Sequence, residues 1–328
     1  MKKVLVTGGA GFIGHHLVNE LIKSDCVVYI VDDFSNSVID PLSYWEDKVR
    51  NVLPQMIEYY DIESDSKRPR IIVLSGDYAN QSITKLVSSG TFDTVYHLAA
   101  KPRVEWSVEN PIESTDENMF KVLSLAKACS SGNTRLVFSS TAAVYGNTDC
   151  LPTSESDLKD PQSPYGLSKL CVEKYLHLFN NLYGLDWVAL RYFNVYGPAQ
   201  PGNSPYSTVV SAWCHKALSA EPLRSDGDGT QTRDMIHVYD VVSANIAVAA
   251  AKNLNQRIFN VGSSKSISNN DIRKYFEQRG FTNVTHAPSR VGDVKHTLAD
   301  ISEITKLGWK PQIDFDEGIN SVLDYWNV

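Results

Sequence analysis

A tyrosine and a lysine stand four positions apart at Tyr165 and Lys169, a spacing that places both side chains on one face of a helix. A phenol in water has a pKa of about 10, so it is a poor base at neutral pH. A nearby ammonium group stabilises the phenolate and lowers that pKa. The pair could therefore supply a general base, although a surface tyrosine beside a solvated lysine would show the same spacing.

A third hydroxyl that could act with this pair is Thr141, which lies upstream in FSSTAAVYG at residues 138–146. The apolar run at residues 135–139 is typical of a strand, so Thr141 is expected where that strand ends. In open α/β sheets, ligands bind at the carboxyl ends of the strands. We expect the Thr141 hydroxyl to bridge a substrate oxygen and the phenol.

A glycine-rich turn at residues 8–14 fits both GxGxxG and GxxGxxG. Glycine lets a pyrophosphate approach bare backbone, and the free N–H groups of the following helix then bind its negative charge. Ordinary turns also use glycine, but here an apolar run at residues 4–6 precedes the turn and Asp32 ends the next strand. A carboxylate there binds the adenosine ribose hydroxyls and repels a 2′-phosphate, so the pattern predicts NAD rather than NADP.

The elements that must position these residues alternate between strands and helices. Apolar runs typical of strands fall at residues 4–6, 27–31, 71–74, 94–98, 135–139 and 187–191, with helical patterns between them, notably at 114–130 and 164–182. This alternation predicts an α/β fold with a parallel sheet covered by helices on both faces. Residues 36–70 are long for a connection and are interpreted as an inserted helix and a mobile loop.

The alternation becomes irregular after Arg191. We predict a dinucleotide-binding domain over residues 1–191 and a smaller substrate-binding lobe over residues 192–328. Residues 234–262 are expected to rejoin the first domain.

Composition excludes several classes of protein. The chain has 328 residues, 42% of them hydrophobic, and a net charge of −7, as in an ordinary globular protein without the basic tract of a nucleic-acid binder. Its five cysteines are odd in number, widely spaced and without a CxxC, so we expect no metal site and reduced thiols in a cytoplasmic protein. No signal peptide or membrane span is predicted.

Together these residues resemble the extended short-chain dehydrogenase/reductase family, within it the NAD-dependent nucleotide-sugar epimerase/dehydratase group, and most of all the UDP-hexose and UDP-N-acetylhexosamine 4-epimerases. The resemblance covers nearly the whole chain. It rests on TGGAGFIG at 7–14, GD at 76–77, HLAA at 97–100, FSSTAAVYG at 138–146, SPYGLSK at 163–169, RYFNVYGP at 191–198, RDMIHVYD at 233–240, FNVG at 259–262 and RVGD at 290–293. It implies a Rossmann-type, doubly wound sheet with tightly bound NAD, a smaller C-terminal substrate lobe, and a homodimer formed through a four-helix bundle of the helices around 114–130 and 165–182.

The resemblance also implies a role for individual residues. The catalytic set is Thr141, Tyr165 and Lys169. The cofactor contacts are Gly8, Gly11, Phe12, Ile13 and Gly14 at the phosphates, Asp32 at the ribose, Asp77 and Tyr78 on the adenine side, Leu98, Ala99, Ala100 and Lys101 beneath the nicotinamide half, and Asn118, Tyr165, Lys169 and Phe193. The substrate contacts are Thr141, Asn194, Arg233, Arg290, Asp293 and Thr297.

The residues after Thr141 distinguish among the reactions of this group. Related 4,6-dehydratases carry Asp-Glu there and decarboxylating relatives a glutamate, whereas this chain has Ala142 and Ala143. Alanine cannot transfer a proton, but reversible oxidation at C4 needs only a hydride acceptor and one acid/base. We therefore predict C4 epimerisation through a 4-keto intermediate, with Tyr165 taking and returning the proton of the C4 hydroxyl.

Other residues concern the substrate. Arg233 and Arg290 match positions that clamp the diphosphate, a task that suits guanidinium, although either could be a solvated surface residue. Asp293 matches a nucleoside-ribose contact. Thr297 matches the family position that controls the space around the C2 substituent, and its small side chain implies a UDP-N-acetylhexosamine or a uronic acid. The nucleotide base stays open, because the family usually has an aromatic or apolar residue just before the GDG turn, whereas here Leu-Arg-Ser-Asp at residues 223–226 precedes it.

Two alternatives stay open. One is another nucleotide-sugar enzyme, such as a 4,6-dehydratase, a uronate epimerase or a reductase. The other is a non-catalytic NAD-sensing regulator, which the retention of Thr141, Tyr165 and Lys169 argues against.

Overall fold

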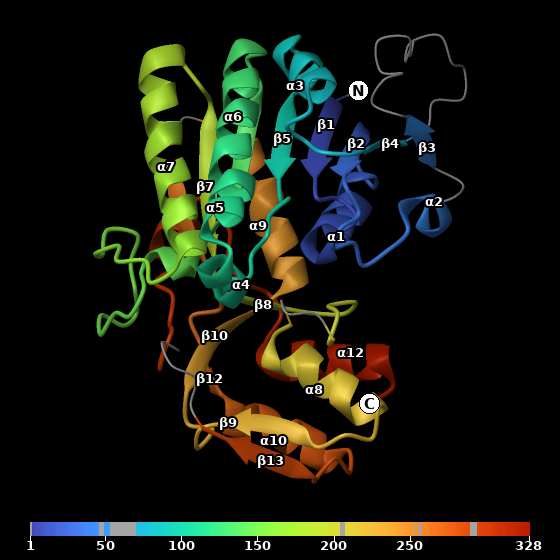
Figure 1. Ribbon diagram of the computed structural model, residues 1–328, viewed down its shortest axis with the longest axis vertical. Helices are drawn as coiled ribbons and strands as arrows, with labels where there is room; N and C mark the ends of the chain where they lie inside the picture. Colours follow the sequence, from blue (N-terminus) through green and yellow to red (C-terminus); the bar gives the residue numbers. More distant parts are fainter. Residues whose placement is uncertain are drawn as a thin grey trace.

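The computed structural model of this protein describes residues 2–45, 49–52, 70–203, 207–252, 254, 257–288 and 294–328. It has a larger α/β lobe and a smaller lobe below it in the view of Figure 1. The chain passes between the two lobes more than once, because α9 (Val238–Ala250) and β11 (Ile258–Val261) lie in the larger lobe and the chain after them returns to the smaller one.

A parallel sheet forms the centre of the larger lobe. In the part of the chain that the structure describes it has eight strands, in the order β11, β7 (Trp187–Tyr192), β6 (Arg135–Thr141), β5 (Thr94–His97), β1 (Lys2–Thr7), β2 (Cys26–Asp32), β4 (Ile71–Ser75) and β3 (Val49–Val52). Every neighbouring pair is parallel. The chain order reverses between β1 and β5, which is the point where open α/β sheets bind ligands. The predicted Rossmann-type fold is confirmed.

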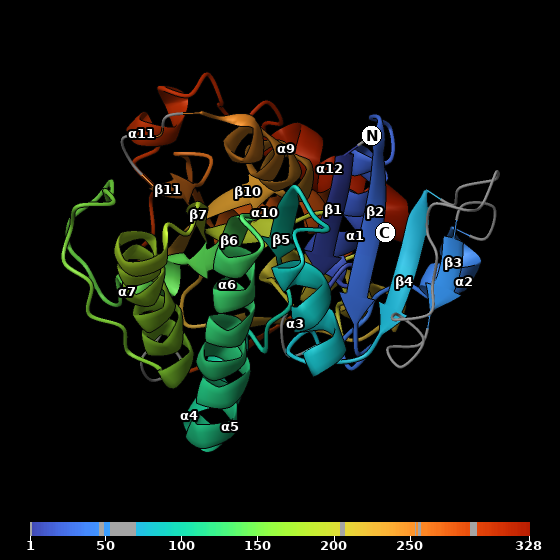
Figure 2. The same ribbon diagram turned by 90° about the horizontal axis from the view of Figure 1, so that it is seen from above.

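Helices cover both faces of this sheet (Figure 2). On one face lie α1 (Phe12–Leu21) and α9, and on the other lie α3 (Gln81–Ser88), α6 (Lys121–Ser131) and α7 (Pro164–Tyr183). Side chains of a strand alternate between the faces, so Val4 and Val6 pack in the α1–α9 layer while Leu5 packs in the other. Both faces are therefore dry, as the uninterrupted apolar strand runs predict.

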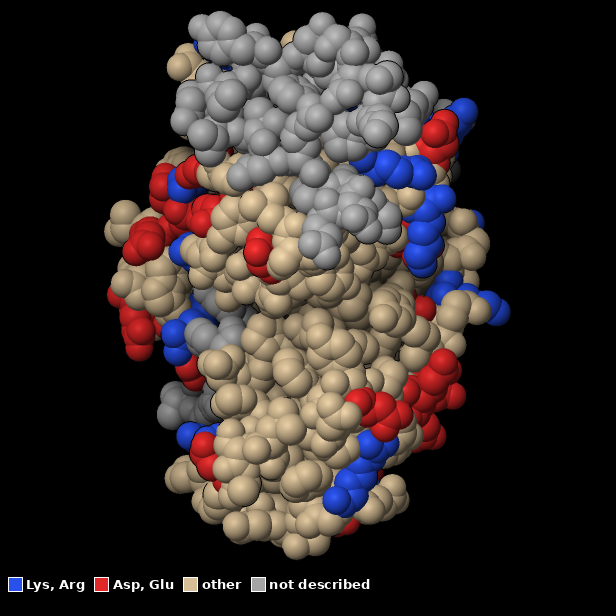
Figure 3. All heavy atoms as spheres, turned by 90° about the vertical axis from the view of Figure 1, so that its right-hand side faces the viewer, with Lys and Arg blue, Asp and Glu red and all other residues tan. Residues whose placement is uncertain are grey.

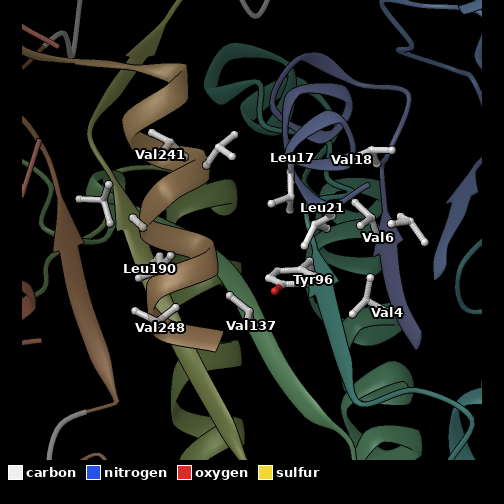
Figure 4. Close-up of a cluster of buried hydrophobic side chains, with 14 of the residues drawn as sticks. Val4, Val6, Leu17, Val18, Leu21, Tyr96, Val137, Leu190, Val241 and Val248 are labelled. Carbon is white, nitrogen blue, oxygen red and sulfur yellow. The ribbon is translucent and has the colours of Figure 1, made fainter. Parts of the chain in front are cut away.

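Figure 4 shows how the α1–α9 layer closes over the sheet. Leucine and valine side chains of the two helices converge on strand side chains from β1, β5, β6 and β7. Among them, Leu17, Val137, Leu190 and Val248 are completely buried. Full burial of such a side chain contributes about 1.5–3 kcal/mol, so this layer holds the strand ends firmly in place.

In the ranges that the structure describes, the smaller lobe is built from short strands and three helices. The strands are β8 (Asn194–Tyr196), β10 (Thr232–His237) and β12 (Ser266–Ser268) in one sheet, with β9 (Leu223–Asp226) and β13 (Val284–Ala287) in another. The helices are α8 (Val209–Leu218), α10 (Asn269–Gln278) and α12 (Phe315–Trp326). Trp213, Phe276 and Ile319 form the centre of its own hydrophobic core. A short helix, α11 (Ser302–Thr305), packs against β11.

The segment after β2 contains two short elements. Helix α2 (Pro41–Tyr44) begins after Asp40, whose carboxylate accepts a hydrogen bond from Leu42 N at 3.0 Å. The edge strand β3 was not predicted, because its four residues alternate too briefly to distinguish a strand from a loop. The loop expected further on falls at residues 53–69, outside the described residues.

Charge and hydropathy add two observations. On the face seen in Figure 3, basic side chains of the described residues lie among acidic ones around a broad uncharged area, and do not gather into a continuous basic surface. No helix within the described ranges is long and apolar enough to cross a bilayer.

Candidate active site

A cleft of about 430 Å³ lies at the carboxyl ends of the parallel strands and extends to both sides of the β1–β5 reversal point. Most of the residues predicted from the sequence line it. They are Gly8, Gly11, Phe12, Ile13, Gly14, Asp32, Asp77, Tyr78, Leu98, Ala99, Ala100, Lys101, Thr141, Tyr165, Lys169, Phe193 and Asn194. The cleft therefore brings the glycine turn and the Thr–Tyr–Lys set into one continuous space.

The glycine turn leaves the first turn of α1 open to the cleft. Gly11 precedes the helix, and no side chain among the described residues caps its amino end. A Cβ on Gly8, which has a φ of +72°, would lie 2.7 Å from Ala99 N, and a Cβ on Gly14 would lie 2.0 Å from Gly8 O. Only glycine permits this close approach of β1, α1 and β5, and the open N–H groups fit a phosphate.

Asp32 stands at the end of β2 and is 8% exposed. Its two carboxylate oxygens accept hydrogen bonds from Ala10 N and Phe34 N, each at 2.9 Å. Burial raises the pKa of this carboxyl group, and the two N–H donors oppose that change. Each oxygen keeps a lone pair for a ribose hydroxyl, so the residue fits the predicted adenosine contact.

A charged group fixes the adenine side of the cleft. Lys121 Nζ lies 2.7 Å from Asp77 Oδ2 and 2.5 Å from Glu117 Oε1, and the Tyr78 hydroxyl donates to Glu117 O at 2.8 Å. Sequence reasoning missed Glu117 and Lys121. Their i,i+4 spacing on a helix was the available signal, but such pairs are common on solvated surfaces.

Asn118 does not line the cleft. It is 1% exposed and lies in η2 (Asp116–Phe120), a π-helical turn between α5 (Pro111–Thr115) and α6. Its Oδ1 accepts from Lys101 N at 3.1 Å, and its Nδ2 donates to Lys101 O at 3.2 Å and to Ser114 O at 2.9 Å. The observed contacts thus hold the backbone beside the cleft, and the direct cofactor contact stays a prediction.

Two serines set the start of α7 and so the position of Tyr165. Ser163 Oγ accepts from Gly166 N at 3.1 Å as the N-cap, and Pro164 occupies the first helical position. Ser107 Oγ, in α4 (Val104–Glu109), accepts from Tyr165 N at 3.3 Å. The tyrosine is therefore held in the first turn, with its side chain buried against the cleft.

Tyr165 and Thr141, the last residue of β6, both line the reacting end of the cleft. Burial raises the pKa of Tyr165 to about 12, and hydrogen bonding to the Thr141 hydroxyl opposes that rise. Lys169 Nζ donates to Ser139 O at 2.8 Å and lies 6.0 Å from the centre of the Tyr165 ring. Burial lowers the pKa of Lys169 to about 7. The lysine thus loses its proton far more readily than a solvated one would.

Few groups at this end of the cleft can move a proton. Ala143 presents a methyl group to the cleft beside Thr141. Among the described residues, the titratable groups lining this end are Lys101, Tyr165, Lys169 and Tyr192. In the part of the chain that the structure describes, no carboxylate lines the reacting end of the cleft. An elimination reaction that requires a separate acid and base would therefore have no carboxylate for either role there.

The predicted substrate residues are divided between the cleft and its surroundings. Asn194 lines the cleft. Arg233 Nη1 donates to Thr232 O at 3.0 Å and to Lys295 O at 3.3 Å, and Thr297 Oγ1 accepts from Asp234 N at 3.0 Å. Both side chains join β10 to the segment after residue 294 and do not line the cleft. The remaining two predicted contacts, Arg290 and Asp293, lie outside the described residues.

Several further polar residues line the cleft although sequence reasoning gave them no role. They are Ser139, Ser140, Tyr192, Gln200 and Thr208. Ser139 and Ser140 lie within FSSTAAVYG and Tyr192 lies within RYFNVYGP, so their place in these motifs was the only signal. Gln200 and Thr208 bond to each other at 2.7 Å and reach the cleft only through the tertiary fold.

We expect Asp32→Asn to weaken NAD binding about 10- to 100-fold, because a hydrogen bond to a charged carboxylate contributes about 1.5–3 kcal/mol. Isothermal titration of nucleotide-stripped protein would measure the change. The matched control is Asp33→Asn, since Asp33 also lines the cleft but is exposed and its carboxylate already accepts from Ser35. Equal losses in the two variants would contradict the ribose assignment.

Comparison with known proteins agrees with this geometry. The profile of the NAD dependent epimerase/dehydratase family matches residues 4–262. A putative UDP-glucose 4-epimerase of Methanocaldococcus jannaschii is 32% identical over 98% of this chain and 97% of its own length. Among solved structures, the UDP-N-acetylglucosamine 4-epimerase of Methanobrevibacter ruminantium, in complex with UDP-N-acetylmuramic acid, superposes with a TM-score of 0.85 at 34% identity over 99% of this chain and 98% of that one. The UDP-glucose 4-epimerase of Thermus thermophilus, in complex with NAD, does so with a TM-score of 0.82 at 29% identity over 99% of both chains. The family and the cofactor predicted from the sequence are confirmed, and this chain belongs to the NAD-dependent epimerase/dehydratase family.

Proposed function

We propose that this protein interconverts the C4 epimers of a UDP-linked sugar with NAD held as a prosthetic group. The observation that carries the proposal is that Thr141, Tyr165 and the buried Lys169 lie together at one end of the cleft, while the two residues that follow Thr141 are alanines. Such a site provides one acid/base. Reversible oxidation at C4 requires no second one.

Three residues of the chain have separate roles in proton transfer. Tyr165 Oη removes the C4 hydroxyl proton and later returns it, while the Thr141 hydroxyl orients the phenol and the substrate oxygen. Lys169 stabilises the phenolate electrostatically, because its ammonium is buried where water screens little. Bound NAD supplies the hydride acceptor, and its positive ring adds to the stabilisation of the phenolate. That added charge is needed, since the pKa of Tyr165 in this structure is raised to about 12.

The alternatives within the family require groups that the described site lacks. A 4,6-dehydratase needs an acid and a base beyond the tyrosine, and the two alanines after Thr141 supply neither. The same absence argues against decarboxylation. A regulator that only senses NAD would not need Tyr165, Thr141 and Lys169 to be joined in one buried cluster.

A UDP-N-acetylhexosamine is our preferred substrate. The small side chain of Thr297 supports it, as does the activity in the name of the Methanobrevibacter enzyme, a UDP-N-acetylglucosamine 4-epimerase. We assign the diphosphate to Asn194, Arg233 and Arg290, and the nucleoside ribose to Asp293. UDP-glucose remains the second candidate, because the two other relatives carry that activity in their names.

We also propose that two copies associate through α7 and the α5–α6 region, which lie side by side (Figure 2). Their outer surface carries large apolar side chains that are exposed to water in the single chain. Clusters of such side chains are typical of interaction surfaces. The residues are Ile112, Phe120, Leu167, Tyr175, Leu178, Leu182 and Tyr183. Two such surfaces would form a four-helix bundle. The five free cysteines support a reducing, cytoplasmic setting.

The activity experiment incubates the purified protein with UDP-glucose, UDP-N-acetylglucosamine and UDP-glucuronic acid in separate reactions without added NAD, and identifies products by NMR. We expect a C4 epimer. Tyr165→Phe should lower kcat by about 10²–10⁴-fold with little change in KM, because general acid–base catalysis contributes that much. A 4-keto-6-deoxy product would refute the argument from the two alanines, and a Tyr165→Phe variant with wild-type kcat would remove the proposed base.

The sugar assignment is tested by Thr297→Tyr. A phenol at this position should fill the space for an N-acetyl group, so kcat/KM should fall by about 10-fold or more for UDP-N-acetylglucosamine and much less for UDP-glucose. The ratio of the two values, measured in one competition assay, is the readout. A parallel fall for both sugars would mean that Thr297 does not discriminate between them.

The dimer is tested by Leu178→Lys, which places a charge on the α7 surface. Sedimentation equilibrium should show the wild type at twice the chain mass and this variant shifted to the monomer, because a buried unpaired charge is costly. Leu218→Lys is the control, since Leu218 is 52% exposed on α8, well away from that surface, whereas Leu178 is 44% exposed. A monomeric wild type would exclude the bundle.

A further inference from the structure

Helix α7 presents three buried polar side chains along one stripe. Tyr165, Lys169 and Glu173 are spaced at i, i+4 and i+8, so they follow one another along the face toward β6. Glu173 is 2% exposed. The reaction proposed above uses the first two residues and leaves the third, a buried carboxylate one turn from the lysine, without a role.

Glu173 is bound by two donors from neighbouring strands. Arg191 of β7 donates Nε to Oε1 at 2.9 Å and Nη2 to Oε2 at 2.6 Å, which is a bidentate pair. Ser140 of β6 donates Oγ to Oε1 at 2.6 Å. Three hydrogen bonds to one carboxylate, all inside the protein, hold it in one orientation.

The Arg191 nitrogen that does not bind Glu173 also has hydrogen-bond acceptors. Its Nη1 donates to the Tyr145 hydroxyl at 2.8 Å and to Glu155 O at 3.3 Å, and the Tyr145 hydroxyl donates to Asn260 Oδ1 at 2.6 Å. A buried ion pair is retained without a large penalty only when its remaining hydrogen-bonding groups find partners. This network meets that condition, and it anchors Glu173 to β7 and β11.

Glu173 and Lys169 together join α7 to the end of β6. Lys169 Nζ donates to Ser139 O at 2.8 Å, and the next residue along the strand, Ser140, donates to Glu173. Thr141 follows directly. Two consecutive strand residues are thus bonded to two consecutive turns of the helix, immediately before the hydroxyl that meets Tyr165. This arrangement fixes both the height and the rotation of the helix against the strand end.

Glu173 also acts on the charge of Lys169. Burial lowers the pKa of Lys169 to about 7, and the Glu173 carboxylate is the group that opposes this change. The other titratable or charged groups near the lysine are either neutral or positively charged. The neutral groups are Tyr165 on α7, Tyr192 on β7 and His97 on β5, whose pKa is lowered by burial and by Lys169. The cations are Arg191 on β7 and Lys159 in the segment before α7, and Lys159 interacts with Glu173 and Arg191.

We propose that Glu173 is a positioning residue for the reaction: held by Arg191 and Ser140, it keeps Lys169 charged and sets Thr141 against Tyr165 without touching the substrate. This inference rests on the proposed function, since the tyrosine–lysine pair is the machinery that it positions. The sign of its effect on pH dependence follows. Removing the Glu173 carboxylate makes the Lys169 ammonium less stable, so Lys169 loses its proton at a lower pH. Above that pH the Tyr165 phenolate is no longer stabilised by the lysine charge.

The experiment compares pH profiles of kcat for the wild type, Glu173→Gln, Glu173→Asp and Ser140→Ala, each as the NAD-loaded protein. Glu173→Gln should move the alkaline limb to lower pH by about one unit or more, a tenfold change in the proton affinity of Lys169. Glu173→Asp keeps the charge and should restore the limb. Ser140→Ala keeps the charge but loses one bond, so kcat should fall at every pH without movement of the limb.

A second measurement does not depend on turnover. The pKa of Lys169 can be followed by NMR of ¹³C-labelled lysine, with Lys169→Met identifying the signal. It should fall in Glu173→Gln. The double variant Glu173→Gln/Arg191→Met leaves no unpaired buried charge, so it tests the same shift if the single variant does not fold.

The outcomes separate the two proposals. A Lys169 pKa that is unchanged in every folded variant lacking the Glu173 carboxylate overturns the positioning role, and so does a uniform loss of kcat with a fixed alkaline limb in Glu173→Gln. If the wild type converts none of the UDP-sugars, the proposed function fails, while the lysine titration still decides whether Glu173 controls Lys169.

Discussion

The proposed reaction needs a positive charge on Lys169 in a place that water does not reach, and much of the structure around the cleft bears on that requirement. The side chain is 1% exposed and burial lowers its pKa to about 7, close to the point where the charge is lost. The backbone carbonyl of Ser139 and the carboxylate of Glu173 oppose that loss. A lysine at the surface would keep its proton without help, but water would screen its effect on a phenol.

That requirement in turn constrains the elements around it. Glu173 is bound inside the protein by Arg191 and Ser140, which ties α7 to β6 and β7. The polar network continues through Tyr145 to β11, a strand that arrives from much later in the chain. The return of the chain to the main sheet thus completes the support of the reacting end.

The other half of the cleft depends on a different limit, the closeness of backbone to backbone. Gly8 lies against Ala99, and Gly14 lies against Gly8, at distances that leave no room for a Cβ. This contact places the open end of α1 beside the end of β5, where the chain order of the sheet reverses. The cleft runs across the reversal point from Asp32 to Tyr165, an extent that fits the proposed dinucleotide.

Local patterns in the sequence were enough to predict the parallel sheet, the glycine turn, Asp32 and the Thr141–Tyr165–Lys169 set, because each depends on spacing within one strand, turn or helix. Contacts between residues that are far apart in the sequence could not be predicted in this way. Nothing in the spacing of Asn118 says that it would bind the backbone of Lys101 rather than line the cleft, and Arg233 gave no sign of its contact with Lys295. Tertiary packing decided those contacts, and it also decided that Glu173, an unremarkable acid on a helix, would be buried against Arg191 and next to the lysine whose charge it sustains. The physical reason is that burial and long-range pairing, which control charge in this site, are properties of the packed chain and not of any one segment.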